Sequence, residues 1–296
     1  MRKSIGELLS EYKIDVACEF CKLWQMFYGN LRDALGASVY YRLSGTDLRL
    51  EKSVKDVCND YFLEFPISFR RTFRSLDEIA DACHYSFESL YLGRNRPVLD
   101  DLLDLAELVW SSLSGLVAMA NESHIELRYA TATIHDAFVP YLNQLMDDLG
   151  FVCAPVDPHW VSLVPKDSRV IEVAGRIPQE LSKKCFTYIH RSMAGNIDAK
   201  REFLREFGCY LEPKRKTLEG FNKTISDKIF SMLNNANIRH NNVIPGDKNY
   251  KAVIADMSAD DLERLYDSTY DLCLTACMLL DSSRATSAIS AVEAKF

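Results

Sequence analysis

The chain has 296 residues and a formal net charge of −7 at pH 7, which argues against a protein that binds nucleic acid over its whole surface. A local basic patch is still compatible with that charge. Hydrophobic residues make up 48% of the chain and charged residues 26%, as is usual for globular proteins. This length allows one large domain or two ordinary ones.

The sequence predicts neither a signal peptide nor a membrane span. We find no apolar run near the roughly 20 residues that cross a bilayer. Glu7 follows Arg2 and Lys3 too soon for the apolar core of a signal peptide. The 9 cysteines have no framework spacing and are typical of reduced thiols in the cytosol. We therefore expect a cytoplasmic protein that has no membrane partner.

Residues 1–148 predict an N-terminal helical domain. Its first helix is expected over residues 4–34, because Ser4-Ile5-Gly6-Glu7 has the form of a capping box and apolar residues follow at helical spacing. Residues 39–50 favour either a short hairpin or an irregular connection. Helical spacing then predicts helices over residues 52–64, 75–92, 99–120 and 125–149, the last of them kinked at Pro140.

Two short apolar runs, 150–156 and 160–165, carry the best β signal in the chain. They predict a two-stranded element near residues 150–165, within a connector of residues 149–176. Further helices are expected over residues 177–195, 198–211, 218–239 and 258–280. Four helices of this length favour a bundle over residues 177–282, and the small, polar residues 283–296 predict a flexible tail. The fold is therefore expected to be mainly α-helical.

The most informative stretch is Asn234-Asn235-Ala236-Asn237-Ile238-Arg239-His240-Asn241-Asn242, which precedes Pro245-Gly246. Proline and glycine prevent a helix from continuing, so Arg239 and His240 are expected at a helix C-terminus. Two explanations stay open. Cations are favourable at a helix C-terminus and asparagine suits the turn that follows. Alternatively, this cluster of polar side chains beside an apolar helix forms a functional site.

Charge is distributed unevenly along the chain. Between residues 181 and 216, 9 basic residues stand against 4 acidic ones, and such a patch can hold a phosphate backbone. Solvated lysines on a helical face explain the same pattern. Residues 75–107 hold 8 acidic residues and 2 arginines, which indicates either a solvated face or a surface that docks a basic partner.

Four segments of the second half carry a resemblance to a known family: residues 195–201, 211–213, 234–242 and 265–267. They look like the C-terminal domain of bacterial abortive-infection proteins, which is similar to the HEPN superfamily of four- to five-helix bundles. Residues 149–165 resemble the small module that often precedes this domain. The first half of the chain resembles no family that we can name.

The resemblance implies a site. HEPN ribonucleases carry an arginine, then a polar residue, and then a histidine that is separated from the arginine by four to six residues. They cut RNA without a metal or cofactor, usually across a dimer. The resemblance implies that Arg239 stabilises phosphate charge and that His240 moves a proton, although positions 244 to 246 hold Ile, Pro and Gly where the family has its second histidine. The RNA contacts implied with this site are Lys183, Lys184, Lys200, Arg201, Asn241, Asn242 and Tyr250.

Two alternatives remain. Arg128 and His135 fit the same spacing, and seven positions place both on one face of a helix. The second hypothesis for the whole chain is a non-catalytic helical adaptor, sensor or inhibitor subunit of a defence complex, whose acidic first half grips a partner protein. The missing histidine and the negative charge favour this hypothesis, whereas the polar cluster favours RNA. Neither hypothesis requires a cofactor or a metal, and the sequence has no phosphate-loop motif.

Overall fold

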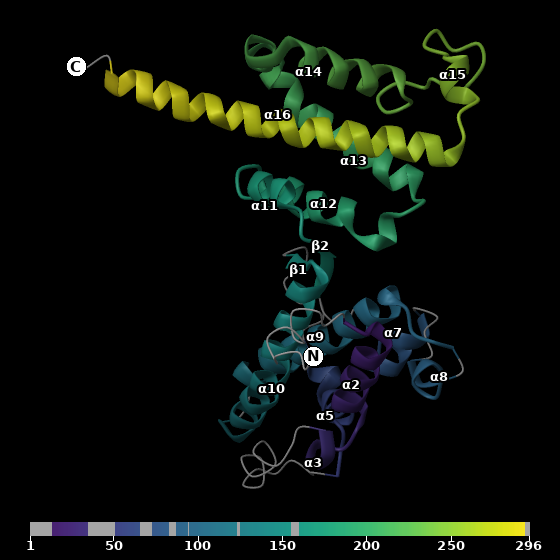
Figure 1. The fold of residues 1–296 in the computed structure, drawn as a ribbon, viewed down its shortest axis with the longest axis vertical. Coiled ribbons are helices and arrows are strands. Elements are labelled where there is room, and N and C mark those ends of the chain that lie inside the picture. The colour runs from purple at the N-terminus through teal and green to yellow at the C-terminus, as the bar shows by residue number, and fades with distance from the viewer. Residues whose placement is uncertain are drawn as a thin grey trace, which may run out of the picture. The chain divides into compact units, whose positions relative to one another are not determined.

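The computed structural model describes residues 14–34, 51–65, 73–82, 87–93, 95–122, 125–154 and 160–293. These residues are mainly α-helical with one two-stranded sheet, which confirms the expected fold class (Figure 1). The chain divides into two compact units, unit 1 (Met1–Leu163) and unit 2 (Val164–Phe296). The division falls inside the connector that the sequence predicts over residues 149–176.

Unit 1 is built around α9 (Leu99–Glu122), which packs against α2 (Val16–Tyr28), α5 (Val54–Tyr61) and α10 (Ile125–Leu149). Apolar side chains at helical spacing along α9 are buried, because each faces a neighbouring helix. They include Leu102, Leu105, Val109, Leu113 and Leu116. The other described helices of the unit are α3 (Leu31–Ala34), η1 (Phe62–Glu64), α7 (Leu76–Ala82) and α8 (Phe87–Tyr91).

The long first helix expected over residues 4–34 is wrong in its described part. Asp15 has an extended backbone, and its side chain accepts hydrogen bonds from the N–H groups of Ala17 and Cys18 at 3.0 and 3.2 Å. It therefore caps a new helix, α2, which ends at Gly29. The capping box at residues 4–7 and the alternatives for residues 39–50 lie outside the described residues.

Helix α9 also corrects the membrane expectation. Within Leu99–Asn121, an 18-residue segment is apolar enough for this helix to cross a bilayer by length and composition, with a mean hydropathy of 1.4. By this test, the sequence prediction that no such run exists is wrong for α9, whose acidic residues lie mostly in its first half. However, 67% of that segment is buried inside the structure. A helix in the core of a unit shows burial of this extent, and α9 packs against α2, α5 and α10.

The expected two-stranded element is present as β1 (Phe151–Ala154) and β2 (Ser162–Pro165). Side chains from α9 hold the chain that enters β2. The Glu107 carboxylate accepts a hydrogen bond from the N–H of Leu163 at 2.6 Å, and the Ser111 hydroxyl accepts one from the N–H of Val161 at 2.9 Å. The backbone at the start of β2 is thus tied to the core helix of unit 1.

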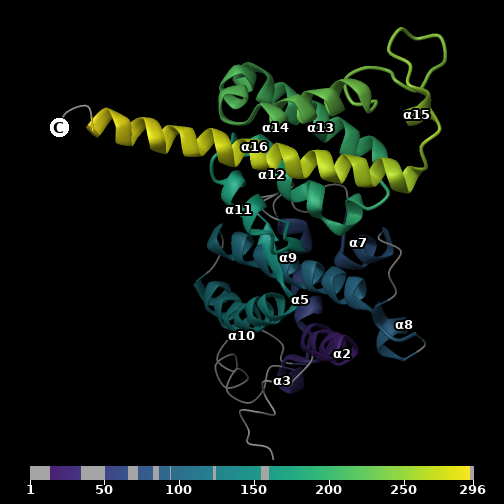
Figure 2. The ribbon, with the colours of Figure 1, turned by 45° about the horizontal axis from the view of Figure 1, so that its top comes forward.

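Unit 2 is a helical bundle in which α16 (Ala259–Glu293) contacts α13 (Ile197–Leu211) and α14 (Arg215–Asn235). Figures 1 and 2 show α16 as the long helix that runs beside both. The remaining elements are α11 (Ser168–Ala174), α12 (Gln179–Ile189), η2 (Arg191–Met193), η3 (Glu212–Lys214) and α15 (Ala252–Ala255). The bundle core includes the buried rings of Phe207, Phe230, Tyr266 and Tyr270.

Several bounds in unit 2 differ from the sequence expectation. Helix α14 ends at Asn235, before Arg239, because Asn237 adopts a left-handed backbone with a φ of 58°. Helix α12 ends at Ile189. Helix α16 continues to Glu293, well past the expected end at residue 280, so residues 283–293 are helical where a tail was expected. The short helices α11 and α15 were not predicted.

Candidate functional site

The segment that follows α14 holds the predicted Arg239 site. The N–H of Ala236 donates to the carbonyl of Met232 and the N–H of Arg239 donates to the carbonyl of Leu233, both at 2.9 Å. Asn237 lies in the left-handed region, where a helix commonly ends, and the N–H of Arg239 reaches back to a carbonyl of the last turn of α14. Asparagine occupies that region more readily than most residues. The asparagines here therefore end the helix and begin a loop of residues 237–251, the 237–251 loop.

Asn242 fixes the shape of the 237–251 loop. Its Oδ1 accepts a hydrogen bond from the N–H of Asn237 and its Nδ2 donates one to the carbonyl of Asn249, both at 2.7 Å. Its carbonyl accepts one from the N–H of Lys251 at 2.8 Å. The Asn242 side chain is fully buried. It joins the two arms of the loop and has no surface for a nucleic-acid contact.

Asn241 and Tyr250 support the same loop from more open positions. The Asn241 side chain is exposed, and its Oδ1 accepts hydrogen bonds from the N–H groups of Val243 and Ile244, each at 3.2 Å. This is an Asx turn, in which a short side chain shapes the backbone next to it. Tyr250 is half-buried, and its N–H donates to the carbonyl of Asp247. Both predicted residues belong to the loop and both retain accessible atoms.

Arg239 faces the inside of the bundle. Its guanidinium forms an ion pair with Glu212, with Nη1 to Oε2 at 2.5 Å, and lies 5.6 Å from the centre of the Phe230 ring. Gly208 allows this approach, because a Cβ there would lie 3.0 Å from Nη2 of Arg239. Burial raises the pKa of the Cys273 thiol well above its ordinary value, and the nearby Arg239 opposes that rise. The arginine is therefore held between α13, α14 and α16.

His240 lies in different surroundings from Arg239. Its side chain is exposed, and it makes no hydrogen bond or ion pair with the part of the chain that the structure describes. Only 19% of the Arg239 side chain is exposed. The two residues are neighbours in the sequence, but the structure does not place both side chains at one open surface. An arrangement in which both touch one phosphate would require the Arg239–Glu212 pair to open.

The four predicted cations outside the loop are all paired with carboxylates. Lys184 pairs with Glu206, Lys183 pairs with Glu180, and Arg201 pairs with Asp198. Lys200 is only 5% exposed, and its Nζ lies 2.7 Å from both Glu263 and Asp267. Burial lowers the pKa of Lys200, but the two carboxylates outweigh burial and raise it. These pairs reduce the positive field of the predicted basic patch. Two are local, at a spacing of three residues, and those of Lys184 and Lys200 join residues far apart in sequence.

The sequence analysis missed two lysines of the 237–251 loop. Lys248 and Lys251 are exposed, and like His240 neither forms an ion pair with any described residue. Figures 1 and 2 show the loop projecting from the bundle between α14 and α15. The signal was present as three cationic or potentially cationic residues in a short Asn-rich stretch. It was passed over because only the denser patch at residues 181–216 was counted.

The alternative pair, Arg128 and His135, makes other contacts in the structure. In α10, Nε and Nη2 of Arg128 donate to the carbonyls of Ala120 and Asn121 at 3.1 and 2.6 Å. Arg128 thereby satisfies carbonyl groups at the end of α9. Nδ1 of His135 lies 3.6 Å from a carboxylate oxygen of Asp136. Arg128 therefore serves the helix end, and its guanidinium is not presented with His135 as a pair.

Metal ligands do not gather in the described residues, where no three His, Cys, Asp or Glu side chains are close enough to hold an ion together. Comparisons of the chain with protein-family models, with curated proteins and with solved structures find no match.

Proposed function

We propose that unit 2 is an RNA-binding bundle of a cytoplasmic bacterial defence protein of the abortive-infection type, and that the 237–251 loop makes the RNA contact. The observation that carries this proposal is the exposure of His240, Lys248 and Lys251 on one loop, none of them paired with a described carboxylate. The resemblance of residues 234–242 to HEPN domains supports RNA as the ligand.

The chemistry of the loop suits a phosphate backbone. Lysines that neutralise phosphates supply most of the affinity of a nucleic-acid complex through the release of counterions. The exposed amide of Asn241 and the half-buried ring of Tyr250 offer a hydrogen bond and a stacking surface beside them. Because Asn242 fixes the loop, little ordering would accompany binding.

In this proposal Arg239 is a positioning residue and the bundle binds RNA without cutting it. The ion pair with Glu212 and the contact with Phe230 keep the guanidinium on the loop's inner side. It braces the start of the loop against α13. Cleavage would require this arginine to leave Glu212. It would also have to proceed without the family's second histidine, because Ile, Pro and Gly occupy positions 244 to 246.

The test is RNA binding by the full chain, measured by fluorescence anisotropy with labelled single-stranded RNA at several salt concentrations. We expect the double variant Lys248→Ala/Lys251→Ala to bind more weakly. Two lost phosphate contacts should reduce the slope of log affinity against log salt by about 1.4, at about 0.7 for each contact. The matched control is Lys183→Ala/Lys184→Ala, in which both lysines already have carboxylate partners.

The outcomes separate the candidates. Weaker binding in the control and not in the loop variant would move the RNA contact to the patch at residues 181–216. To test cleavage, the unaltered chain and the variants Arg239→Ala and His240→Ala are incubated with total RNA in a chelator. Cleavage products that appear with the unaltered chain and are lost in both variants would overturn the proposal that the bundle binds RNA without cutting it. Absence of any binding at micromolar protein would reject RNA as the ligand.

A second candidate, the adaptor subunit of a defence complex, is favoured by two exposed apolar side chains, one in the loop and one just after it. Ile244 is 56% exposed and Val253 is 72% exposed. Such side chains beside cations are typical of protein interfaces more than of RNA contacts. This candidate stands if RNA binding is absent and a partner protein, or a second copy of the chain, associates through a surface that Ile244→Ser/Val253→Ser weakens.

A further inference from the structure

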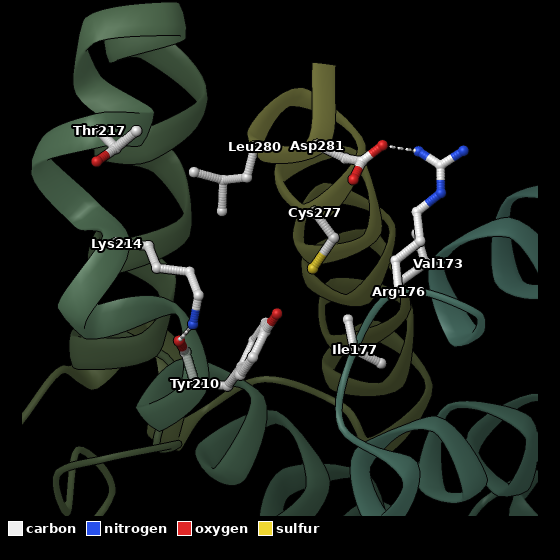
Figure 3. Close-up of a pocket in the computed structure, with 9 residues that line it drawn as sticks. All are labelled: Val173, Arg176, Ile177, Tyr210, Lys214, Thr217, Cys277, Leu280 and Asp281. Atoms are coloured by element: carbon white, nitrogen blue, oxygen red, sulfur yellow. Dashed lines mark hydrogen bonds and ion pairs between the residues drawn. The ribbon is translucent and has the colours of Figure 1, made fainter. Parts of the chain in front are cut away.

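A pocket of about 200 Å³ lies in unit 2, far from the 237–251 loop in sequence. Its apolar lining comes from Val173 of α11, Ile177 just after that helix and Leu280 of α16. Tyr210 of α13 and Lys214 of η3 line it as well. Figure 3 shows Tyr210, Leu280 and the thiol of Cys277 pointing toward the same central space.

Lys214 places a cation at the edge of this space. Its Nζ donates to the carbonyl of Tyr210 at 2.8 Å and lies 3.5 Å from the centre of the same residue's ring. These contacts hold the ammonium in a fixed position. Burial raises the pKa of the Cys277 thiol to about 12, and Lys214 opposes that rise. The ammonium therefore lies close enough to the floor of the pocket for its charge to act there.

The carboxylate among the lining residues is engaged on the opposite rim. Asp281 forms an ion pair with Arg176, which also pairs with Glu172 at 2.8 Å (Figure 3). The charge of Asp281 is thereby balanced by Arg176. The lining thus combines apolar side chains with two cations, Arg176, which pairs with Asp281 and Glu172, and Lys214, whose ammonium is held at the Tyr210 carbonyl. Such a lining orients ligands that have an apolar body and a single negative end.

We propose that this pocket binds a small monoanion with an apolar body, of the class of aromatic or branched short-chain carboxylates. The carboxylate lies against Lys214, and the hydrocarbon lies on Val173, Ile177 and Leu280. Size supports this class, because a cavity of about 150 Å³ holds benzene and the pocket is only slightly larger. The proposal is independent of RNA binding.

The experiment uses ligand-observed NMR on the full chain with two probes of equal shape, benzoate and its uncharged counterpart benzamide. We expect benzoate to bind more tightly than benzamide. Lys214→Met should weaken benzoate binding about tenfold or more, as for the loss of a hydrogen bond to a charged group, and should leave benzamide unchanged. The matched control is Lys216→Met, an exposed lysine two positions away and outside the pocket.

A second measurement needs no variant. Cys277 is 8% exposed and lines the pocket, whereas Cys209 is exposed outside it. Alkylation by iodoacetamide, followed for each cysteine by peptide mass spectrometry, should slow at Cys277 when benzoate is present and stay unchanged at Cys209. Equal binding of the two probes, or equal effects of the two lysine variants, would overturn the proposal that Lys214 recognises the negative charge of the ligand. Benzoate that neither binds at millimolar concentration nor protects Cys277 would overturn the site.

Discussion

Asn242 stabilises the 237–251 loop at the scale of a single residue. Replacing it with alanine leaves the N–H of Asn237 and the carbonyl of Asn249 without their side-chain partners. An unsatisfied buried polar group costs about 1–3 kcal/mol, so we expect Asn242→Ala to lower the free energy of unfolding by about 2 kcal/mol. Urea denaturation followed by circular dichroism measures it.

The control for this prediction is the neighbouring residue. Asn241 is exposed and its side chain accepts hydrogen bonds from Val243 and Ile244 only. Water can replace those bonds, so Asn241→Ala should cost less than about 1 kcal/mol. Equal losses in the two variants would show that burial of Asn242 does not set its contribution. RNA affinity should also fall in Asn242→Ala if the loop carries the contact.

At the scale of elements, a glycine sets the distance between α13 and α14. A Cβ on Gly208 would lie 2.7 Å from Cδ1 of Leu233, which is fully buried. Gly208→Ala gains about 1 kcal/mol of helix propensity but overpacks a core, which costs about 1–3 kcal/mol. Since the buried Leu233 has no room to move away, we expect a net loss of about 1 kcal/mol.

Gly220 of α14 gives the opposite expectation. A Cβ there would meet nothing within 4 Å. Because Asn222, with a φ of −152°, interrupts α14 two residues later, Gly220→Ala should raise the free energy of unfolding by less than about 1 kcal/mol. Thermal and urea denaturation of both variants test the sign. A stabilising Gly208→Ala would mean that α13 and α14 separate at little cost, and that Arg239 is not confined by their contact.

The elements that could be predicted are those whose signal is local. Apolar periodicity gave α9, α10 and α13, since each buries one continuous face. Features set by contacts far along the chain were not accessible. Lys200 looked like a surface cation, yet it is neutralised by Glu263 and Asp267. Arg239 looked like a phosphate ligand, yet it pairs with Glu212 across the turn between α13 and α14.

Over the whole molecule, buried thiols couple stability to alkaline pH. Burial raises the pKa of Cys58 in unit 1 and of Cys273 in unit 2 well above the ordinary range, and raises that of Cys185 to about 12. In the unfolded chain these thiols ionise near pH 8.5. The folded state holds these protons more tightly than the unfolded chain does. The contribution of the protonated thiols to the free energy of unfolding is therefore complete below about pH 8.5 and is lost as the pH rises toward the folded pKa values.

We therefore expect the free energy of unfolding to be level near pH 7–8 and to fall between about pH 9 and 11, by about 1.4 kcal/mol per pH unit for each buried thiol. Urea denaturation at each pH measures this slope. Cys273→Ala should reduce it by one thiol, whereas Cys209→Ser should not, because Cys209 is exposed. A slope that both substitutions leave unchanged would assign the alkaline loss to other groups.

The 3 tryptophans allow the two units to be followed separately, because Trp24, Trp110 and Trp160 all belong to unit 1. Their fluorescence reports unit 1, while circular dichroism reports both units. Unit 2 holds the buried Cys185, Cys273 and Cys277, and burial also raises the pKa of Tyr188 and Tyr270 there. If the units unfold independently, the circular-dichroism midpoint should fall further than the fluorescence midpoint above pH 9. Coincident shifts would indicate that the two units unfold as one cooperative body.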